Sequence, residues 1–261
     1  MPQIDVPLVQ GRFGATSRPD TWWVQPLAVF LGFSAFIVYS TWAAFVGDFY
    51  RFGPYLSPMY SPELFGSPQA WFGPKPDWFP AFLPFSAAFL ILWAPGGFRF
   101  TCYYYRGAYY KAFWADPPNC TVGEPRKTYW GERTFPLIIQ NIHRYFLLFA
   151  VILVVILAHD AWDGFMGWPD GFHVNIGSLV LLINVVLLGC YTFGCHSLRH
   201  LIGGIKDVLS SSPVRKKAYD CVSCLNARHM RFAWFSLIWV GFTDLYVRMC
   251  AMNIWTDWRL F

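Results

Sequence analysis

The chain has 261 residues, of which 56% are hydrophobic, 21% aromatic and only 13% charged. A soluble domain carries about 25% charged residues, so this composition excludes an ordinary soluble protein. It predicts an all-α integral membrane protein in the lipid bilayer. The formal net charge of +5 gives no reason to expect a nucleic-acid partner, because the basic residues sort by loop, as they do in membrane proteins.

Five apolar runs are long enough to cross a bilayer. Their approximate bounds are 24–46, 79–105, 137–158, 174–202 and 229–252. We therefore expect residues 1–261 to form a single membrane domain, a bundle of five transmembrane helices. Residues 47–78 are rich in proline, glycine and aromatic residues and should cap the outer end of the bundle. Inside the second run, Ala94-Pro95-Gly96-Gly97 predicts a kink or a local unwinding.

Basic residues gather in the loops after the second and fourth runs. They are Arg106, Lys111, Arg126, Lys127 and Arg133 in one loop, and Lys206, Arg215, Lys216, Lys217 and Arg228 in the other. The loop after the third run has none. Because basic loops stay in the cytoplasm, the pattern predicts a cytoplasmic N-terminus and a C-terminus outside.

Cysteine and histidine residues occur at four of the helix ends that should face the cytoplasm. Cys102 ends the second run, His143 begins the third, Cys195 lies near the end of the fourth and His229 begins the fifth. Ionisable groups at membrane depth are costly and usually serve a function. The alternating topology therefore predicts a site at one membrane level, close to the cytoplasm.

Two further histidines follow Cys195. His196 and His200 are four residues apart and share one helix face, whereas Cys195 points about 100° away. Two cysteines and two histidines suit a Rieske-type [2Fe–2S] cluster. Two facing histidines would suit a b-type haem, and zinc also accepts mixed ligands, so the residues alone leave these alternatives open.

Other polar residues have simpler interpretations. Asn184 and Asp244 lie toward the outer side and should make hydrogen bonds between helices. His159 and His173 lie in or beside the outer turn and should be solvated. Residues 221–224 have Cys-x-x-Cys spacing without a second pair, which favours two incidental thiols over a zinc site. Arg99 either reaches lipid headgroups or contacts a quinone or a cofactor edge.

Several segments carry a resemblance to a known family. They are FRFTCYYYR at 98–106, AYY at 108–110, FPLIIQNIHRY at 135–145, YTFGCH at 191–196, WVGFTDLYVR at 239–248, YSTWAAF at 39–45 and YLSP at 55–58. They resemble the membrane anchor, an SdhC-type cytochrome b-like subunit, of actinobacterial succinate dehydrogenases, which are succinate:quinone oxidoreductases. The resemblance covers nearly the whole chain.

The resemblance implies a quinone-reducing subunit in a bacterial plasma membrane, which is not catalytic toward succinate alone. The implied partners are a flavoprotein subunit and an iron–sulfur subunit docked on the cytoplasmic side. The resemblance is also compatible with a higher oligomer of the complex. The implied cofactors are a membrane-embedded Rieske-type [2Fe–2S] cluster and a quinone, either menaquinone or ubiquinone.

Within this resemblance we assign Cys102 and Cys195 as thiolate ligands, and His143 and His229 as imidazole ligands. The first two runs contain no histidine, so the pattern of two haems stacked across the membrane fails. His196 or His200 could replace either histidine ligand.

A quinone pocket is expected near the same level. Tyr103, Arg106, His196 and His200 are its candidates, with histidine or arginine supplying protons or stabilising a semiquinone charge. Two other functions remain as alternatives, namely a b-type cytochrome anchor with one bis-histidine haem and a non-redox membrane scaffold or transporter.

Overall fold

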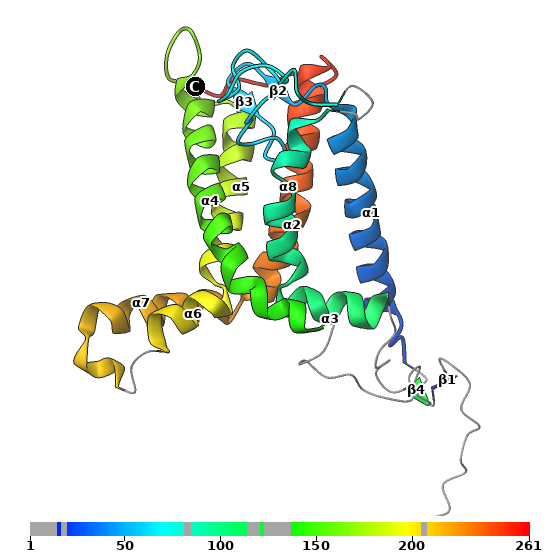
Figure 1. Ribbon diagram of the computed structural model, residues 1–261, viewed down its shortest axis with the longest axis vertical. Coiled ribbons are helices and arrows are strands. Elements are labelled where there is room, and N and C mark those ends of the chain that lie inside the picture. The colour runs from blue at the N-terminus through cyan, green and yellow to red at the C-terminus, as the bar shows by residue number, and fades with distance from the viewer. Residues whose placement is uncertain (1–14, 17–19, 81–84, 114–120, 123–136, 205–207) are drawn as a thin grey trace, which may run out of the picture.

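The computed structural model describes residues 15–16, 20–80, 85–113, 121–122, 137–204 and 208–261. Four long helices and one short helix stand side by side in an upright bundle (Figure 1). They are α1 (Val24–Val46), α2 (Trp93–Phe100), α4 (His143–Met166), α5 (Ile176–Phe193) and α8 (His229–Ala251). Three other helices lie across one end of this bundle (Figure 1), namely α3 (Tyr103–Ala112), α6 (His196–Gly203) and α7 (Pro213–Asn226).

Three helical stretches are long and apolar enough to cross a membrane, counting only the described residues. They are Val24–Val46, Ile138–Met166 and Ile176–Phe193. Helix α8 is also 23 residues long, but Arg231, Asp244 and Arg248 reduce its apolar character. Helix α2 has only 8 residues and follows the short 3₁₀ helix η1 (Ala87–Leu90). The chain is therefore a helical membrane protein, while the count of five spans and the orientation of the termini stay predictions.

The second apolar run does not break where its glycines and proline predict. Helix α2 begins at Trp93, so Pro95 lies in its first turn, where a residue without an N–H loses no helical hydrogen bond. The chain stays helical through Gly97 and turns instead at Cys102, after which α3 runs along the end of the bundle. A Cβ atom at Gly97 would overlap the ring of Phe146, so this glycine lets α2 approach α4 closely.

The third and fourth runs also differ from their predicted bounds. The 3₁₀ helix η2 (Leu137–Ile142) leads into α4, which continues to Met166 rather than ending at 158. The fourth run is interrupted after Phe193, and α6 starts only at His196. The basic segment that follows, predicted as a loop, contains the 3₁₀ helix η3 (Leu209–Ser211) and α7.

Residues 47–78 pack over the end of the bundle opposite α3, α6 and α7 (Figure 1). The strands β2 (Arg51–Phe52) and β3 (Tyr55–Leu56) pair antiparallel there, with Arg51 opposite Leu56. A second short pair joins β1 (Ala15–Thr16) to β4 (Thr121–Val122). Tyr55 is fully buried and donates a hydrogen bond to Asp257 (2.7 Å). The capping segment is thus tied to the C-terminal tail.

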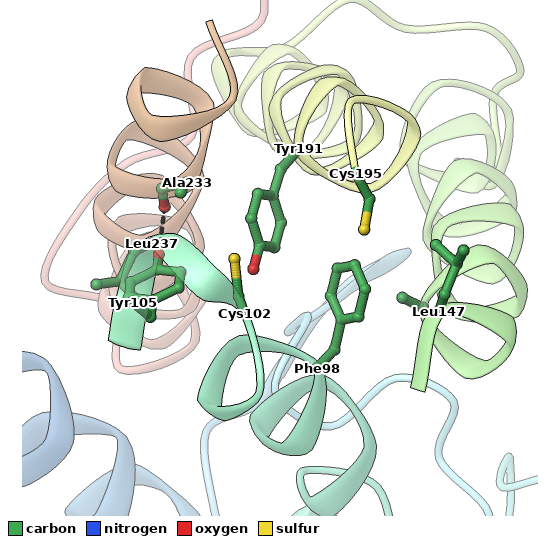
Figure 2. Close-up of a cluster of buried hydrophobic side chains, with 9 residues drawn as sticks. Phe98, Cys102, Tyr105, Leu147, Tyr191, Cys195, Ala233 and Leu237 are labelled. Carbon is green, nitrogen blue, oxygen red and sulfur yellow. Dashed lines mark hydrogen bonds between the residues drawn. The ribbon is translucent and has the colours of Figure 1, made fainter. Parts of the chain in front are cut away.

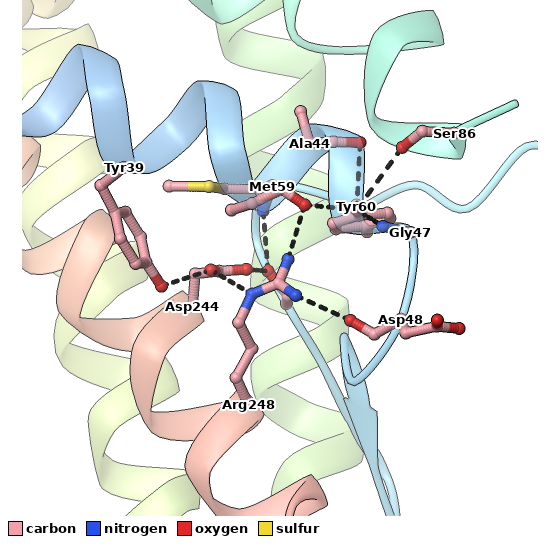
Figure 3. A network of polar contacts seen from close by, with 11 residues as sticks. Tyr39, Ala44, Gly47, Asp48, Met59, Tyr60, Ser86, Asp244 and Arg248 are labelled. Carbon is pink, nitrogen blue, oxygen red and sulfur yellow. Dashed lines mark hydrogen bonds and ion pairs between the residues drawn. The ribbon is translucent and has the colours of Figure 1, made fainter. Parts of the chain in front are cut away.

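A buried ion pair connects this cap to α8 and α1 (Figure 3). The Arg248 Nε atom lies 2.7 Å from the Asp244 carboxylate, and both side chains are essentially inaccessible. Arg248 also donates to the carbonyls of Asp48 (2.7 Å) and Ala43 (3.0 Å). Tyr39 of α1 donates to Asp244 at 2.6 Å, which confirms the predicted hydrogen bond between helices.

Two of the simpler interpretations are wrong, and the predicted exposure of His159 is confirmed. Asn184 is 1% exposed, and neither side-chain polar atom has a hydrogen-bond partner among the described residues. His173 is buried rather than solvated, stacking on Trp168 with ring centroids 5.5 Å apart. His159 is exposed as expected, but it lies on α4 and not in the turn that follows.

Candidate metal centre

Two cysteines occupy equivalent positions in the backbone. Cys102 is the residue before α3 and has φ −68° and ψ 133°. Cys195 is the residue before α6 and has φ −64° and ψ 138°. Each is therefore an extended residue at which the chain leaves an upright helix and enters a helix lying across the bundle end (Figure 1). This shared geometry places both thiols inside the same end of the bundle.

Each thiol lies against one imidazole. The Nε2 atom of His143 is 3.1 Å from the Cys195 Sγ atom, and the Nε2 atom of His229 is 3.7 Å from the Cys102 Sγ atom. All of these side chains are buried, with exposures between 1% and 8%. The residues predicted as metal ligands therefore meet in two thiol–imidazole pairs.

Aromatic rings cross-connect the two pairs. Phe98 stacks on His143 with ring centroids 4.5 Å apart and an interplanar angle of 12°. Tyr191 stacks on His229 at 4.9 Å and 20°, and the two aromatic rings meet edge to face at 5.3 Å. His143 thus contacts the thiol of Cys195 and the ring of Phe98, whereas His229 contacts the thiol of Cys102 and the ring of Tyr191. Both aromatic rings and both thiols face the same interior region (Figure 2).

The orientation of His143 is fixed by Thr101. The threonine hydroxyl donates to the Gly97 carbonyl (2.7 Å), and its oxygen lies 2.8 Å from His143 Nδ1. Because the hydroxyl proton is committed to the carbonyl, Nδ1–H is the donor in the second contact. The other nitrogen, Nε2, then carries a lone pair toward Cys195, which is the form that binds a metal. His229 differs, since its Nδ1 atom is buried without a partner among the described residues.

A positive charge lies beside these pairs. The Arg99 guanidinium is 4.8 Å from the centroid of the Tyr191 ring. It donates to Tyr105 Oη (2.6 Å), to the Ala233 carbonyl (3.1 Å) and to Ser236 Oγ (3.0 Å). These contacts hold Arg99 inside the bundle, which contradicts the headgroup alternative.

The donor set fits a Rieske-type cluster in its chemistry. Such a cluster takes two thiolates on one iron and two imidazoles on the other, and the residues here offer both. Within the described part of the chain, no three metal-binding side chains converge on one point, so the donors form two pairs. Cluster binding would replace both sulfur–nitrogen contacts. Backbone N–H groups at the starts of α3 and α6 are directed at the two sulfurs, as donors to metal-bound thiolates are.

The predicted quinone residues do not form one contact network. Tyr103 is 64% exposed and stacks under the Arg106 guanidinium at 4.6 Å, which also donates to Gln140 (3.0 Å). His196 and His200 contact each other on α6, with their Nε2 atoms 3.1 Å apart. No hydrogen bond or ring contact between the two groups occurs in the described chain.

Sequence reasoning did not find Thr101, Phe98 or Tyr191. A positional regularity could have revealed two of them, because each aromatic residue lies four positions before a cysteine. That spacing places ring and thiol on one helix face. Thr101 had no comparable pattern, and its role depends on the rotation of α4 about its axis.

Comparison with known proteins places this geometry in a family. Residues 24–253 match the family described as actinobacterial succinate dehydrogenase subunit SdhC. The chain is also similar to a chain in the solved structure of the Mycobacterium smegmatis Sdh1 complex in the apo form. The identity is 42%, the match covers 97% of this chain and 96% of that chain, and the TM-score is 0.87. No curated protein matches the chain significantly.

Proposed function

Because the chain belongs to the actinobacterial succinate dehydrogenase SdhC family, we propose that it relays electrons from the iron–sulfur subunit to quinone. The proposed carrier is a Rieske-type [2Fe–2S] cluster held by Cys102, His143, Cys195 and His229. A membrane anchor of a succinate dehydrogenase complex would in this way be the quinone-reducing part of the enzyme.

One observation carries this proposal. Two equivalent breaks in the backbone bring two thiols and two imidazoles to one buried level at one end of the bundle. Buried ionisable groups at membrane depth are expensive and mark function. When bound there, a [2Fe–2S] cluster with histidine ligands supplies one-electron transfer at a potential above that of plant-type ferredoxins.

The chain's own residues have distinct tasks in this scheme. Thr101 holds the His143 ring so that Nε2 faces inward. Phe98 and Tyr191 pack against the imidazoles and exclude water from them. Arg99 places a fixed positive charge nearby, which would favour a reduced, more negative group held by these residues because charges interact strongly away from bulk water.

Quinone reduction also requires two protons, and exposed groups at the same end of the bundle could deliver them. His196 and His200 are in contact with each other at the surface of α6. We propose this pair as the proton route to a menaquinone or ubiquinone. Tyr103 and Arg106, which stack on one another, would contact the quinone head group.

The side of the membrane on which the proposed centre lies determines where the partner subunits dock. The proposed centre lies at the end that carries α3, α6 and α7, with exposed basic residues such as Arg228 and Arg231 beside it. If this end faces the cytoplasm of a bacterial plasma membrane, the iron–sulfur subunit docks here and brings the flavoprotein subunit with it.

Pulsed electron paramagnetic resonance of the purified complex tests the proposal. With ¹⁵N-labelled histidine, the reduced cluster should show coupling to histidine nitrogen. His143→Gln and His229→Gln should each remove the coupling of one histidine nitrogen or the cluster signal itself, whereas His196→Gln and His200→Gln should preserve both couplings. Size-exclusion chromatography confirms that each variant still assembles.

Three results would contradict the proposal. The first is full nitrogen coupling in His143→Gln or His229→Gln. The second is a sharp reduced α band in the visible spectrum, which indicates a bis-histidine haem. The third is iron no higher than the partner subunits account for, which indicates a non-redox scaffold.

A further inference from the structure

A groove separates α6 from the start of α7. Its volume is ≈ 540 Å³, and its apolar walls include Leu201, Ile202, Val214 and Ala218. Leu201 is 56% exposed and Val214 is 85% exposed. Apolar side chains this exposed are stable in contact with lipid, and together they mark a surface that something covers.

Positive charge borders the groove. Arg215 lines it, and Lys216 and Lys217 follow on the same helix. Lys216 pairs with Asp220 at 2.7 Å, whereas no carboxylate in the described chain pairs with Arg215 or Lys217. These cations occupy the first turns of α7, the positive end of the helix dipole, where basic residues are unfavourable. A bound anion would offset that repulsion.

The position of the groove indicates which kind of ligand it binds. Helices α6 and α7 lie across the end of the bundle and extend sideways past it (Figure 1). The pair is rigidly joined, since Arg199 packs over the Tyr219 ring at 4.9 Å and donates to Ser223 (3.0 Å). In a bilayer that surrounds the upright bundle, a helix pair in this position would lie at the interface between acyl chains and headgroups.

We propose that this groove binds an anionic phospholipid. An acyl chain would lie against Leu201, Val214 and Ala218, and the headgroup phosphate would pair with Arg215 and Lys217. Positive charge matched to phosphate, beside an apolar channel at the membrane surface, is the chemistry that recognises this class of ligand. The site is separate from the thiol–imidazole pairs and does not depend on the proposed electron relay.

Native mass spectrometry of the detergent-purified complex, titrated with phosphatidylglycerol or with phosphatidylcholine of the same acyl chains, tests the site. The wild type should bind phosphatidylglycerol more tightly. Arg215→Gln should weaken that binding about fivefold, since one basic residue near a membrane surface contributes about 1 kcal/mol. Lys111→Gln removes the same charge from α3 and should leave the binding unchanged.

A second pair of variants tests the apolar channel. Ala218→Trp fills the groove and should abolish the preference for phosphatidylglycerol, whereas Ala227→Trp, on the exposed end of α7, should retain it. Equal binding of the two lipids, or an equal loss in both members of either pair, would overturn the proposal. Complete competition by inorganic phosphate would indicate a phosphate site instead. Loss of the partner subunits in Ala218→Trp would identify the groove as a protein interface.

Discussion

The buried ion pair on α8 gives a sharp test of the packing. Replacing Arg248 by Met removes its bond to Asp244 and its bonds to the carbonyls of Asp48 and Ala43. The methionine occupies similar volume, so the change is mainly electrostatic. Asp244, at 0% exposure, would then be a buried carboxylate without a cation.

The expected cost follows from that uncompensated charge. Removing one partner of a buried pair costs about 3–5 kcal/mol. Tyr39 and Ser57 would still donate to Asp244, which keeps the loss within this range. In the double variant Arg248→Met/Asp244→Asn no charge is left. The amide oxygen accepts from one of the two hydroxyls, and the amide NH2 group faces the oxygen of the other. The double variant loses mainly the two carbonyl contacts, which cost about 1 kcal/mol each. The single variant also carries the cost of the buried charge, so the double variant should be about 2 kcal/mol more stable.

Thermal unfolding of the purified complex in detergent measures these differences. Arg259→Met is the matched control, because Arg259 pairs with Asp170 at 3.1 Å while both side chains are more than half exposed. Such surface pairs contribute about 0–1 kcal/mol. The reasoning is refuted if Arg248→Met unfolds at the same temperature as Arg259→Met, or if the double variant is less stable than the single one.

Two further predictions concern the candidate metal centre and the packing beside it. Thr101→Val should lower the iron bound per complex, because losing a partner of a ligating histidine costs about 10–100-fold in metal affinity; Thr101→Ser should restore the iron, and equal iron in both variants would exclude a positioning role toward His143. Gly97→Ala should destabilise the complex by about 1–3 kcal/mol through overpacking against Phe146. Gly96→Ala, where a Cβ meets nothing within 4 Å, should be neutral or slightly stabilising in the same thermal unfolding assay.

The helices predicted most accurately are those that a single stretch of sequence indicates by itself. Helix α1 coincides with the apolar run at 24–46, and α8 begins and ends within a residue of the run at 229–252. Both follow from apolar length alone. The basic segment after the fourth run was harder, because α7 has a mixed surface and buries only Val222.

The candidate centre was predictable in its members but not in its pairing. Alternating spans place Cys102, His143, Cys195 and His229 at one end, and that argument needs only topology. Which thiol meets which imidazole depends on how each helix is rotated about its axis, which tertiary packing decides. The turn at Cys102 was missed for a related reason, since Pro95 and its glycines draw attention to a position where the helix is only beginning.

The outer end shows the limits of local reasoning most clearly. His173 is polar and adjoins a loop, so exposure was the natural expectation. Its burial comes from Trp168 and from the C-terminal tail, whose Leu260 donates to the carbonyl of Val174. Contacts between residues so far apart in the chain leave no trace in the local sequence.

The pairing of thiols with imidazoles also has a consequence for biogenesis. Cys195 and His143 are 52 positions apart and meet as soon as α4 and α5 have packed, whereas Cys102 and His229 are separated by 127 positions. A nascent chain that has not yet inserted α8 therefore has three of the four donors but only one complete thiol–imidazole pair. If the proposed cluster occupies this centre, its full ligand set exists only after the last helix has packed, so that assembly of the membrane domain would act as the checkpoint for loading.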